Sequence, residues 1–238
     1  MLLFLLRHAD PVYEPDDITT LGLRQAEALA YRLSKNGIDK IYSSSSNRAI
    51  RTALPTSKKT KREIEVLDWA NEKHLWLDLT VKKSDGGLTW CFSDKDFIEF
   101  FQTEEIRTLG ARWYEHKAFS ASNYKSAMQR IDKEADLFLE NLGYRHSRER
   151  GGYIPLKPND SRVAFFAHHG FGVAFLSSIL DIPFPTFATR FDISHSGMTV
   201  VDFSGEGNLI VPKILQLSND SHLYKFGIPT KYNNYLEF

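Results

Sequence analysis

A short apolar run at the start of the chain, Leu2–Leu6, constrains the fold most strongly. Its five apolar residues end abruptly in Arg7 and His8, and a loop containing Pro11 follows. An uninterrupted apolar run is typical of a strand buried on both faces of a parallel sheet. In open α/β sheets, ligands bind just beyond the carboxyl ends of such strands. An arginine beside a histidine at that edge indicates an anion site with a reactive group.

The segments that follow alternate between helical and extended patterns. Apolar residues spaced three and four apart predict a helix over residues 22–33, with Thr19 or Thr20 as its N-cap. Strands are predicted at 38–42 and 64–67, and a helix from residue 47 to 58 lies between them. This strand-helix-strand-helix-strand order predicts an α/β fold, with a mostly parallel sheet covered by helices.

The middle of the chain, residues 76–160, differs in character because it is rich in aromatic residues. They are Trp76, Trp90, Phe92, Phe97, Phe100, Phe101, Trp113, Tyr114, Phe119 and Tyr124. We interpret most of them as core packing; the alternative is a lid over the edge of the first strand. A long helix is predicted at 127–142, followed by a polar loop at 145–152. We expect residues 1–238 to form a single domain in which 76–160 is a helical insertion or cap.

A second apolar strand is predicted at 162–167, and it ends in His168 and His169. A helix over 171–180 follows it, and residues 198–203 and 209–217 are predicted to form a closing hairpin. One histidine at the end of a strand is weak evidence for a functional site. Two apolar strands that each end in histidine, in strand-loop-helix contexts, predict a shared site at one edge of the sheet.

Composition excludes several classes of partner. Lys+Arg and Asp+Glu number 30 each in 238 residues, so the formal net charge is +0 and no global charge attracts nucleic acid or an anionic membrane. No apolar run is long enough to span a bilayer, and the apolar start lacks the features of a signal peptide. The single cysteine, Cys91, excludes an intrachain disulfide framework and a cysteine-type zinc site. We expect a cytoplasmic protein without nucleic-acid or membrane partners.

Five short motifs, in order along the chain, resemble those of the histidine phosphatase superfamily, also called phosphoglycerate mutase-like. They are residues 6–9 (Leu-Arg-His-Ala), 19–26 (Thr-Thr-Leu-Gly-Leu-Arg-Gln-Ala), 42–53 (with Ser-Ser-Asn-Arg-Ala at 45–49), 71–74 (Asn-Glu-Lys-His) and 166–170 (Phe-Ala-His-His-Gly). The resemblance covers residues 1–75 and 160–185, and the middle insertion matches no motif of the family. It implies a three-layer α/β/α fold around a mostly parallel central sheet.

The resemblance also implies a reaction and the residues that carry it. In this family a phosphoryl group passes through phosphohistidine without metal or cofactor, which assigns the nucleophile to His8 and the general acid and base to Glu72. Arg7 and Arg48 match the phosphate-binding arginines. His168 matches the second catalytic histidine, by counting back from Ile182-Pro183 at the family's usual helix length, and His169 is the alternative.

The chemistry is consistent with these roles. A nucleophilic histidine must be neutral, because only a ring nitrogen with a free lone pair can attack phosphorus. We expect Arg7, Arg48 and a protonated His168 to lower the pKa of His8 and to bind phosphate oxygens. His169 stands where the family's His-Gly-Gly motif has its first glycine, and we expect it to contact the substrate. His195 is a further candidate for the pocket wall.

Several alternatives remain open at this stage. A phosphoglycerate mutase usually has Gly-Glu-Ser after Arg-His, whereas this chain has Ala9-Asp10-Pro11, which favours a phosphatase acting on a small phosphorylated metabolite. A phospho-ligand-binding module without catalysis is a third hypothesis. Were Glu72 not the acid, Glu63, Glu65 or Asp68 would be next. A dimetal site on His8, His168 and His169 lacks the clustered carboxylates that such sites need, so we predict no metal. The motifs carry no information on the oligomeric state.

Overall fold

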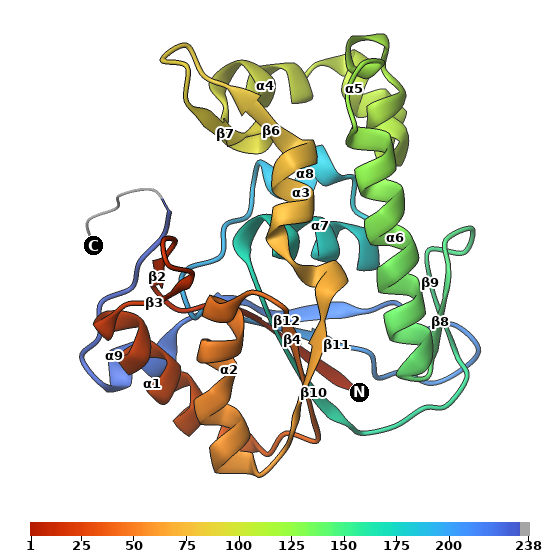
Figure 1. Cartoon of the computed structure of the whole chain (residues 1–238). Coiled ribbons are helices and arrows are strands. Elements are labelled where there is room, and N and C mark those ends of the chain that lie inside the picture. The colour runs from red at the N-terminus through yellow and green to blue at the C-terminus, as the bar shows by residue number, and fades with distance from the viewer. Residues whose placement is uncertain (234–238) are drawn as a thin grey trace.

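A six-stranded sheet forms the centre of the molecule, in a computed structural model that describes residues 1–233 apart from the side chain of Asn36. The strand order is β12-β11-β1-β10-β4-β5 (Figure 1). The strands are β1 (Leu2–Arg7), β4 (Lys40–Ser44), β5 (Ile64–Leu67), β10 (Arg162–Ala167), β11 (Met198–Asp202) and β12 (Lys213–Asn219). β1, β10, β4 and β5 are parallel, whereas β11 and β12 pair antiparallel. The predicted mostly parallel sheet is confirmed.

Helices cover both faces of this sheet (Figure 1). Side chains alternate along β1, so Phe4 and Leu6 pack in a cluster with residues of α1 (Thr20–Asn36) and α2 (Asn47–Thr60). Leu3 and Leu5 belong to a larger cluster with α6 (Tyr124–Asn141) and α7 (His169–Ile179). A strand that is apolar on both faces therefore lies between two helical layers, as its sequence predicts. α9 (Ser221–Lys225) lies beside α1.

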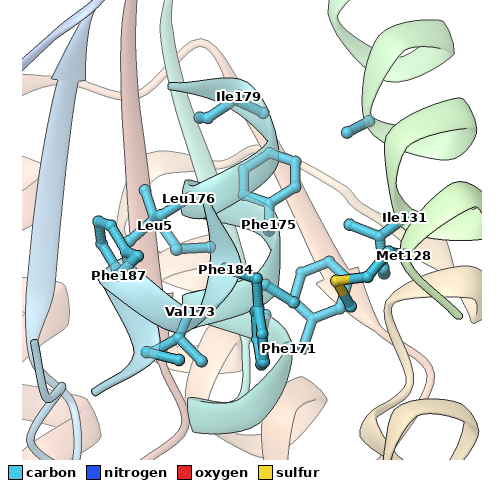
Figure 2. Packing of buried hydrophobic residues seen from close by; sticks show 14 of the residues in the cluster. Leu5, Met128, Ile131, Phe171, Val173, Phe175, Leu176, Ile179, Phe184 and Phe187 are labelled. Carbon is cyan, nitrogen blue, oxygen red and sulfur yellow. The ribbon is translucent and has the colours of Figure 1, made fainter. Parts of the chain in front are cut away.

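Helix α7 is the most deeply buried helix of the described chain, since each of its residues from His169 to Ile179 is buried. Such a helix needs apolar neighbours on all sides. Figure 2 shows Phe171 and Phe175 beside Met128 and Ile131 of α6, with Leu5 of β1 near Leu176 on the other side. α8 (Phe184–Ala188) contributes Phe184 and Phe187 to the same cluster. The packing fixes the first residues of α7 firmly against the sheet.

The insertion packs on this core. Helix α3 (Glu72–Leu79) leads into it from the sheet edge. Its further elements include β6 (Thr80–Lys82), β7 (Leu88–Trp90), α4 (Lys95–Phe101), α5 (Glu104–Leu109), β8 (Tyr144–Ser147) and β9 (Gly152–Pro155). Short 3₁₀ turns at 91–93, 110–115 and 117–119 join several of them. Most of its aromatic residues are buried in the cluster that contains α7, namely Trp90, Phe92, Phe101, Trp113, Phe119 and Tyr124. The interpretation of these residues as core packing is confirmed.

Several predicted boundaries are wrong, for physical reasons. The polar loop expected at 145–152 is the β8–β9 hairpin, in which the rings of His146 and Tyr153 stack at 4.2 Å. The first loop contains the small hairpin of β2 (Pro11–Val12) and β3 (Asp17–Ile18). The strand predicted at 38–42 begins at Lys40, because Gly37, with φ of +76°, ends α1. The closing pair β11–β12 is confirmed, but β12 starts at Lys213 because Ile210 bridges to Tyr153 instead.

No helix within residues 1–233 is both long and apolar enough to cross a lipid bilayer.

A buried histidine in the β8–β9 hairpin makes stability depend on pH. His146 bonds to the carboxylates of Asp136 at 2.8 Å and Asp181 at 3.0 Å, and Arg148 also binds Asp136 at 2.9 Å. Burial favours the neutral ring, but the two carboxylates outweigh it and raise the pKa of His146. A raised pKa stabilises the fold fully below the unfolded-state value of about 6.5, and this stabilisation is lost as pH rises through the folded-state pKa.

We predict that His146→Gln lowers the free energy of unfolding by about 1–3 kcal/mol at pH 6, and that the difference shrinks toward pH 9. Urea unfolding across this pH range measures it. His74→Gln is the matched control, because His74 forms an exposed pair with Asp68 at 3.3 Å that contributes little. A deficit of His146→Gln that does not change with pH would contradict the assigned pair.

Candidate active site

The parallel pairing of β1 with β10 brings the two strand-end histidines together. Arg7 pairs with Ala167 in the register, and the backbone N–H of His8 donates to the Ala167 carbonyl at 2.8 Å. The next residues, His8 and His168, therefore leave the sheet at the same edge. Their rings lie edge to face, with centroids 5.2 Å apart. The structure thus brings the two strand-end histidines together at one edge of the sheet.

Two further elements bring an arginine and a carboxylate to this edge. Arg48 lies in the first turn of α2, directly after β4, and Glu72 is the first residue of α3, after β5. Glu72 Oε2 lies 3.5 Å from Arg48 Nη2 and 3.8 Å from His168 Nδ1. Glu72 Oε1 accepts the backbone N–H of Gly170 at 2.7 Å, so the N-terminus of α7 orients the carboxylate.

The protonation state of His8 follows from its contacts. Its Nδ1 lies 2.8 Å from the carbonyl oxygen of Ala9. A carbonyl can only accept a hydrogen bond, so the ring proton resides on Nδ1 and the lone pair on Nε2. Burial, with His168, Arg7 and Arg48 next in importance, lowers the pKa of His8 well below its usual 6.5. The imidazole is therefore neutral near pH 7.

His168 is neutral as well, which corrects the expectation of a protonated second histidine. Burial lowers the pKa of His168 to about 4, and Glu72 only partly offsets this effect. Its Nε2 lies 2.8 Å from the Ser44 hydroxyl and 3.3 Å from that of Ser46. When Ser44 donates to Nε2, the ring proton resides on Nδ1, on the side of Glu72. Burial therefore has a larger effect on the pKa values of both His8 and His168 than the neighbouring cations have.

Hydrogen bonds within the protein occupy most of the guanidinium group of Arg7. It is 2% exposed, and burial lowers its pKa to about 10, so it keeps its charge. Its Nη2 lies 2.6 Å from Nε2 of His195, and it also donates to the Ile193 carbonyl and to the Asn233 side chain. An arginine cannot accept, so Nε2 of His195 carries the lone pair. The His195 ring lies beside that of His8, with centroids 5.7 Å apart, but His195 does not line the cavity around His8 and Arg7, so it is not the wall residue that was expected.

Arg48 and His169 each have an acidic partner. Arg48 Nη1 bonds to Asp16 at 2.8 Å, and its guanidinium lies 5.4 Å from the Tyr13 ring. His169 Nε2 lies 2.8 Å from Asp192, and its ring also faces the cavity. The structure thus places all six predicted site residues at one edge: Arg7, His8, Arg48, Glu72, His168 and His169. The other acid candidates, Glu63, Glu65 and Asp68, do not line this cavity.

Sequence reasoning missed several residues that support the site. Asp16, Asp192 and Asn233 lie in connecting segments with no periodic pattern, and they reach Arg48, His169 and Arg7 respectively. Ser44 sits in a run of four serines, which indicated a break in regular structure but not a partner for His168. A stretch of hydroxyls at the end of a buried strand was the available signal, since buried polar groups need partners there.

The site is built to hold an anion. Seven buried side-chain nitrogen or oxygen atoms of the described residues have no hydrogen-bond partner, and three of them belong to predicted site residues: Arg7 Nε, Arg48 Nε and His168 Nδ1. Unsatisfied buried donors are costly, and an oxyanion would satisfy them. A ligand atom each from His8, Glu72 and His168 lies within 4.8 Å of the others, a set that could also hold a metal ion. Two guanidinium groups beside this trio disfavour a divalent cation and favour phosphate.

Arg7, His8, Arg48, Glu72 and His169 line a cavity of about 650 Å³. Residues of the insertion that line it are Trp76, Leu88, Thr89 and Trp90. The part of the insertion around β7 therefore lies beside the candidate catalytic residues at the end of β1, where the lid hypothesis expects it. Whether it closes over a substrate stays a prediction.

Comparison with known proteins finds a matching family and a curated relative. Residues 3–80, which carry Arg7, His8, Arg48 and Glu72, match the model of the histidine phosphatase superfamily, branch 1. Over these residues the chain is similar to members of this superfamily. A curated relative in Hydrogenobacter thermophilus, named "Putative phosphoserine phosphatase 2", is 34% identical over 105 residues, or 37% of this chain. The alignment spans only 51% of that protein.

Solved structures of superfamily members share the fold. A phosphoserine phosphatase of Entamoeba histolytica, in complex with 3-phosphoglyceric acid, superposes with a TM-score of 0.59 at 17% identity, covering 93% of this chain and 98% of that one. A mycobacterial glucosyl-3-phosphoglycerate phosphatase gives 0.57 at 19% identity, with 90% and 97% covered. The α-ribazole phosphatase of Shigella flexneri gives 0.55 at 15% identity, with 92% and 97% covered. At such identities the likeness concerns the fold, and the three-layer α/β/α architecture is confirmed.

Gly170 joins the insertion to the site. A Cβ at this position would lie 2.5 Å from the indole of Trp90, and the Gly170 N–H holds Glu72. We predict that Gly170→Ala lowers the free energy of unfolding by about 1–3 kcal/mol, although alanine favours helices, because the clash is with a packed ring. Gly172→Ala is the control, since its Cβ would meet methyl groups of Ile193 at 3.1 Å and Leu5 at 3.5 Å rather than a packed ring. An equal or larger loss in Gly172→Ala, measured by urea unfolding, would contradict this assignment.

Proposed function

We propose that the protein is a metal-independent phosphatase that hydrolyses a phosphomonoester through a phosphohistidine on His8. The observation that carries the proposal is the hydrogen bond between His8 Nδ1 and the Ala9 carbonyl. It fixes the tautomer and leaves a lone pair on Nε2, within a cavity lined by two arginines. The match of residues 3–80 to the superfamily model and the phosphatase named among the curated relatives support the same activity. A small phosphorylated metabolite as substrate and a cytoplasmic location are part of the proposal.

In the first step, Nε2 of His8 attacks phosphorus and the bond to the leaving oxygen breaks. Arg7, Arg48 and the Nδ1–H of His168 hold the phosphoryl oxygens, where charge is spread in the transition state. The phosphorylated imidazole keeps its proton on Nδ1 and is cationic. The Ala9 carbonyl accepts that proton's hydrogen bond and stabilises the intermediate.

Glu72 is assigned as general acid and base. In the free site burial alone would raise its pKa, but His168 and Arg48 outweigh it and keep the pKa lowered. A bound phosphate group adds up to two negative charges beside it and raises the pKa, so the substrate itself favours the protonated acid. Glu72 then gives its proton to the leaving oxygen. In the second step it takes a proton from the water that attacks phosphorus, the N–P bond breaks, and phosphate leaves.

We predict that the purified protein releases inorganic phosphate from an aryl phosphate without added metal, and that a chelator does not stop it. His8→Ala removes this turnover and the acid-labile phosphoprotein formed from labelled substrate. His74→Ala, a change on α3 outside the cavity, is the control that keeps both. Near-normal turnover in His8→Ala would refute the nucleophile. A phosphoprotein that transfers its phosphoryl group to a second hydroxyl with little phosphate release would indicate a mutase.

We predict that Glu72→Gln slows turnover by roughly 10²–10⁴-fold, because the amide cannot transfer a proton. Its carbonyl oxygen can still accept the Gly170 N–H, so vanadate binding is much less affected. Glu65→Gln, on the neighbouring strand β5 and outside the cavity, is the matched control. If Glu65→Gln loses as much activity as Glu72→Gln, the acid is assigned to the wrong carboxylate.

A further inference from the structure

The cavity extends outward from Glu72 along one face of α3. Glu72 and Trp76 are four residues apart, so their side chains lie on the same face of the helix, one turn from each other. Both line the cavity. In the proposed reaction Glu72 gives its proton to the leaving oxygen. Trp76 is therefore within reach of a group attached to that oxygen, along the same face of the helix.

The wall that this group meets is apolar and already in place. Trp76 and Trp90 pack edge to face, with ring centroids 4.8 Å apart, and Trp90 stacks on Phe92 at 5.4 Å. Trp90 is 8% exposed and lies against Gly170, so it is anchored to α7. Leu88, at the start of β7, and Tyr13, on the β2–β3 turn, are exposed and complete the wall.

Charge is distributed unevenly along the cavity. Buried Arg7 and the partly buried pair Arg48 and Glu72 lie at the phosphoryl end, where Asp16 also pairs with Arg48. The outer part has a single cation, Lys73, on the exposed side of α3, with the neutral side chains of Asn71 and Thr89. A leaving group as small and polar as serine would leave the aromatic wall without contacts. A cavity of about 650 Å³ is of the size that holds a compound with a ring system.

From this arrangement, and resting on the proposed phosphatase function, we propose that the substrate is the phosphomonoester of an alcohol or phenol that carries a flat apolar or aromatic group, which packs against Trp76, Trp90 and Leu88. The aromatic rings supply a large contact area at low entropic cost, because they are immobilised before the substrate binds. The reaction releases this alcohol and inorganic phosphate. Residues of the insertion thus select the leaving group, whereas residues at the edge of the sheet carry out the reaction.

The test compares phosphate release from 2-phenylethyl phosphate, ethyl phosphate and phosphoserine. The first two have similar alkyl leaving oxygens, so the ratio of their kcat/KM values reports contacts of the ring. We expect 2-phenylethyl phosphate to be favoured over both others by roughly tenfold or more, the scale of apolar pocket contacts. Trp76→Ala lowers the ratio of 2-phenylethyl to ethyl phosphate by a similar factor. Leu77→Ala, an exposed change at the next residue of α3, leaves the ratio unchanged.

Leu88→Ala provides a second variant should Trp76→Ala not fold, since Leu88 is 52% exposed and its loss removes little core packing. It is expected to lower the same ratio by a smaller factor. Calorimetry with 2-phenylethylphosphonate and ethylphosphonate gives a readout that is independent of turnover, and the aromatic compound is expected to bind more tightly. A preference for phosphoserine, or equal use and binding of the aromatic and ethyl compounds, would overturn this inference and leave the phosphatase proposal standing. If no ester is hydrolysed, the phosphatase proposal fails, and the two phosphonate affinities still decide on the apolar subsite.

Discussion

The parallel pairing of β1 with β10 is the constraint on which the site depends. It joins segments that are far apart in the sequence, and its register places Arg7 opposite Ala167. Because both strands run in the same direction, their polar ends emerge at one edge, and His8 and His168 meet there. A shift of either strand by one residue would send every side chain to the other face. The two different clusters on the two faces of β1 oppose such a shift.

Burial, more than charge, determines the protonation states at this edge. It is the largest single influence on the pKa values of His8, His168 and Arg7, and in each case it lowers the value. The resulting charge differs between histidine and arginine because their usual pKa values differ. The histidines become neutral near pH 7, whereas Arg7, with a pKa of about 10, keeps its charge. A single physical effect thus yields neutral imidazoles beside a cationic guanidinium, the combination that a nucleophile acting on phosphate requires.

Much of the framework could be predicted from the sequence, because its signals are local. The apolar runs of β1 and β10 and the cap at Thr19 show in composition and spacing, and β5 has the predicted bounds. The residues at strand ends were found for the same reason. The β8–β9 hairpin was not, since its sequence is polar and its pairing depends on packing of His146 and Tyr153. Asp16, Asp192 and Asn233 were missed because only the folded chain places these loop residues beside the site. The prediction that His168 is protonated was wrong, because the burial of a side chain cannot be read from a sequence motif.

The contact between Trp90 and Gly170 links the apolar wall of the cavity to the position of the Glu72 carboxylate, so selectivity and rate, which are often independent in enzymes, depend on one position. The same glycine that admits the indole also offers its N–H to Glu72. A change in the β6–β7 hairpin that displaces Trp90 would therefore be transmitted to the carboxylate through a single backbone position. In the proposed enzyme, selectivity and rate would not vary independently. Substitutions that adapt this pocket to a new compound would have to keep the contact between Trp90 and Gly170. The exposed residues Leu88 and Tyr13, at the rim of the cavity, are free to change.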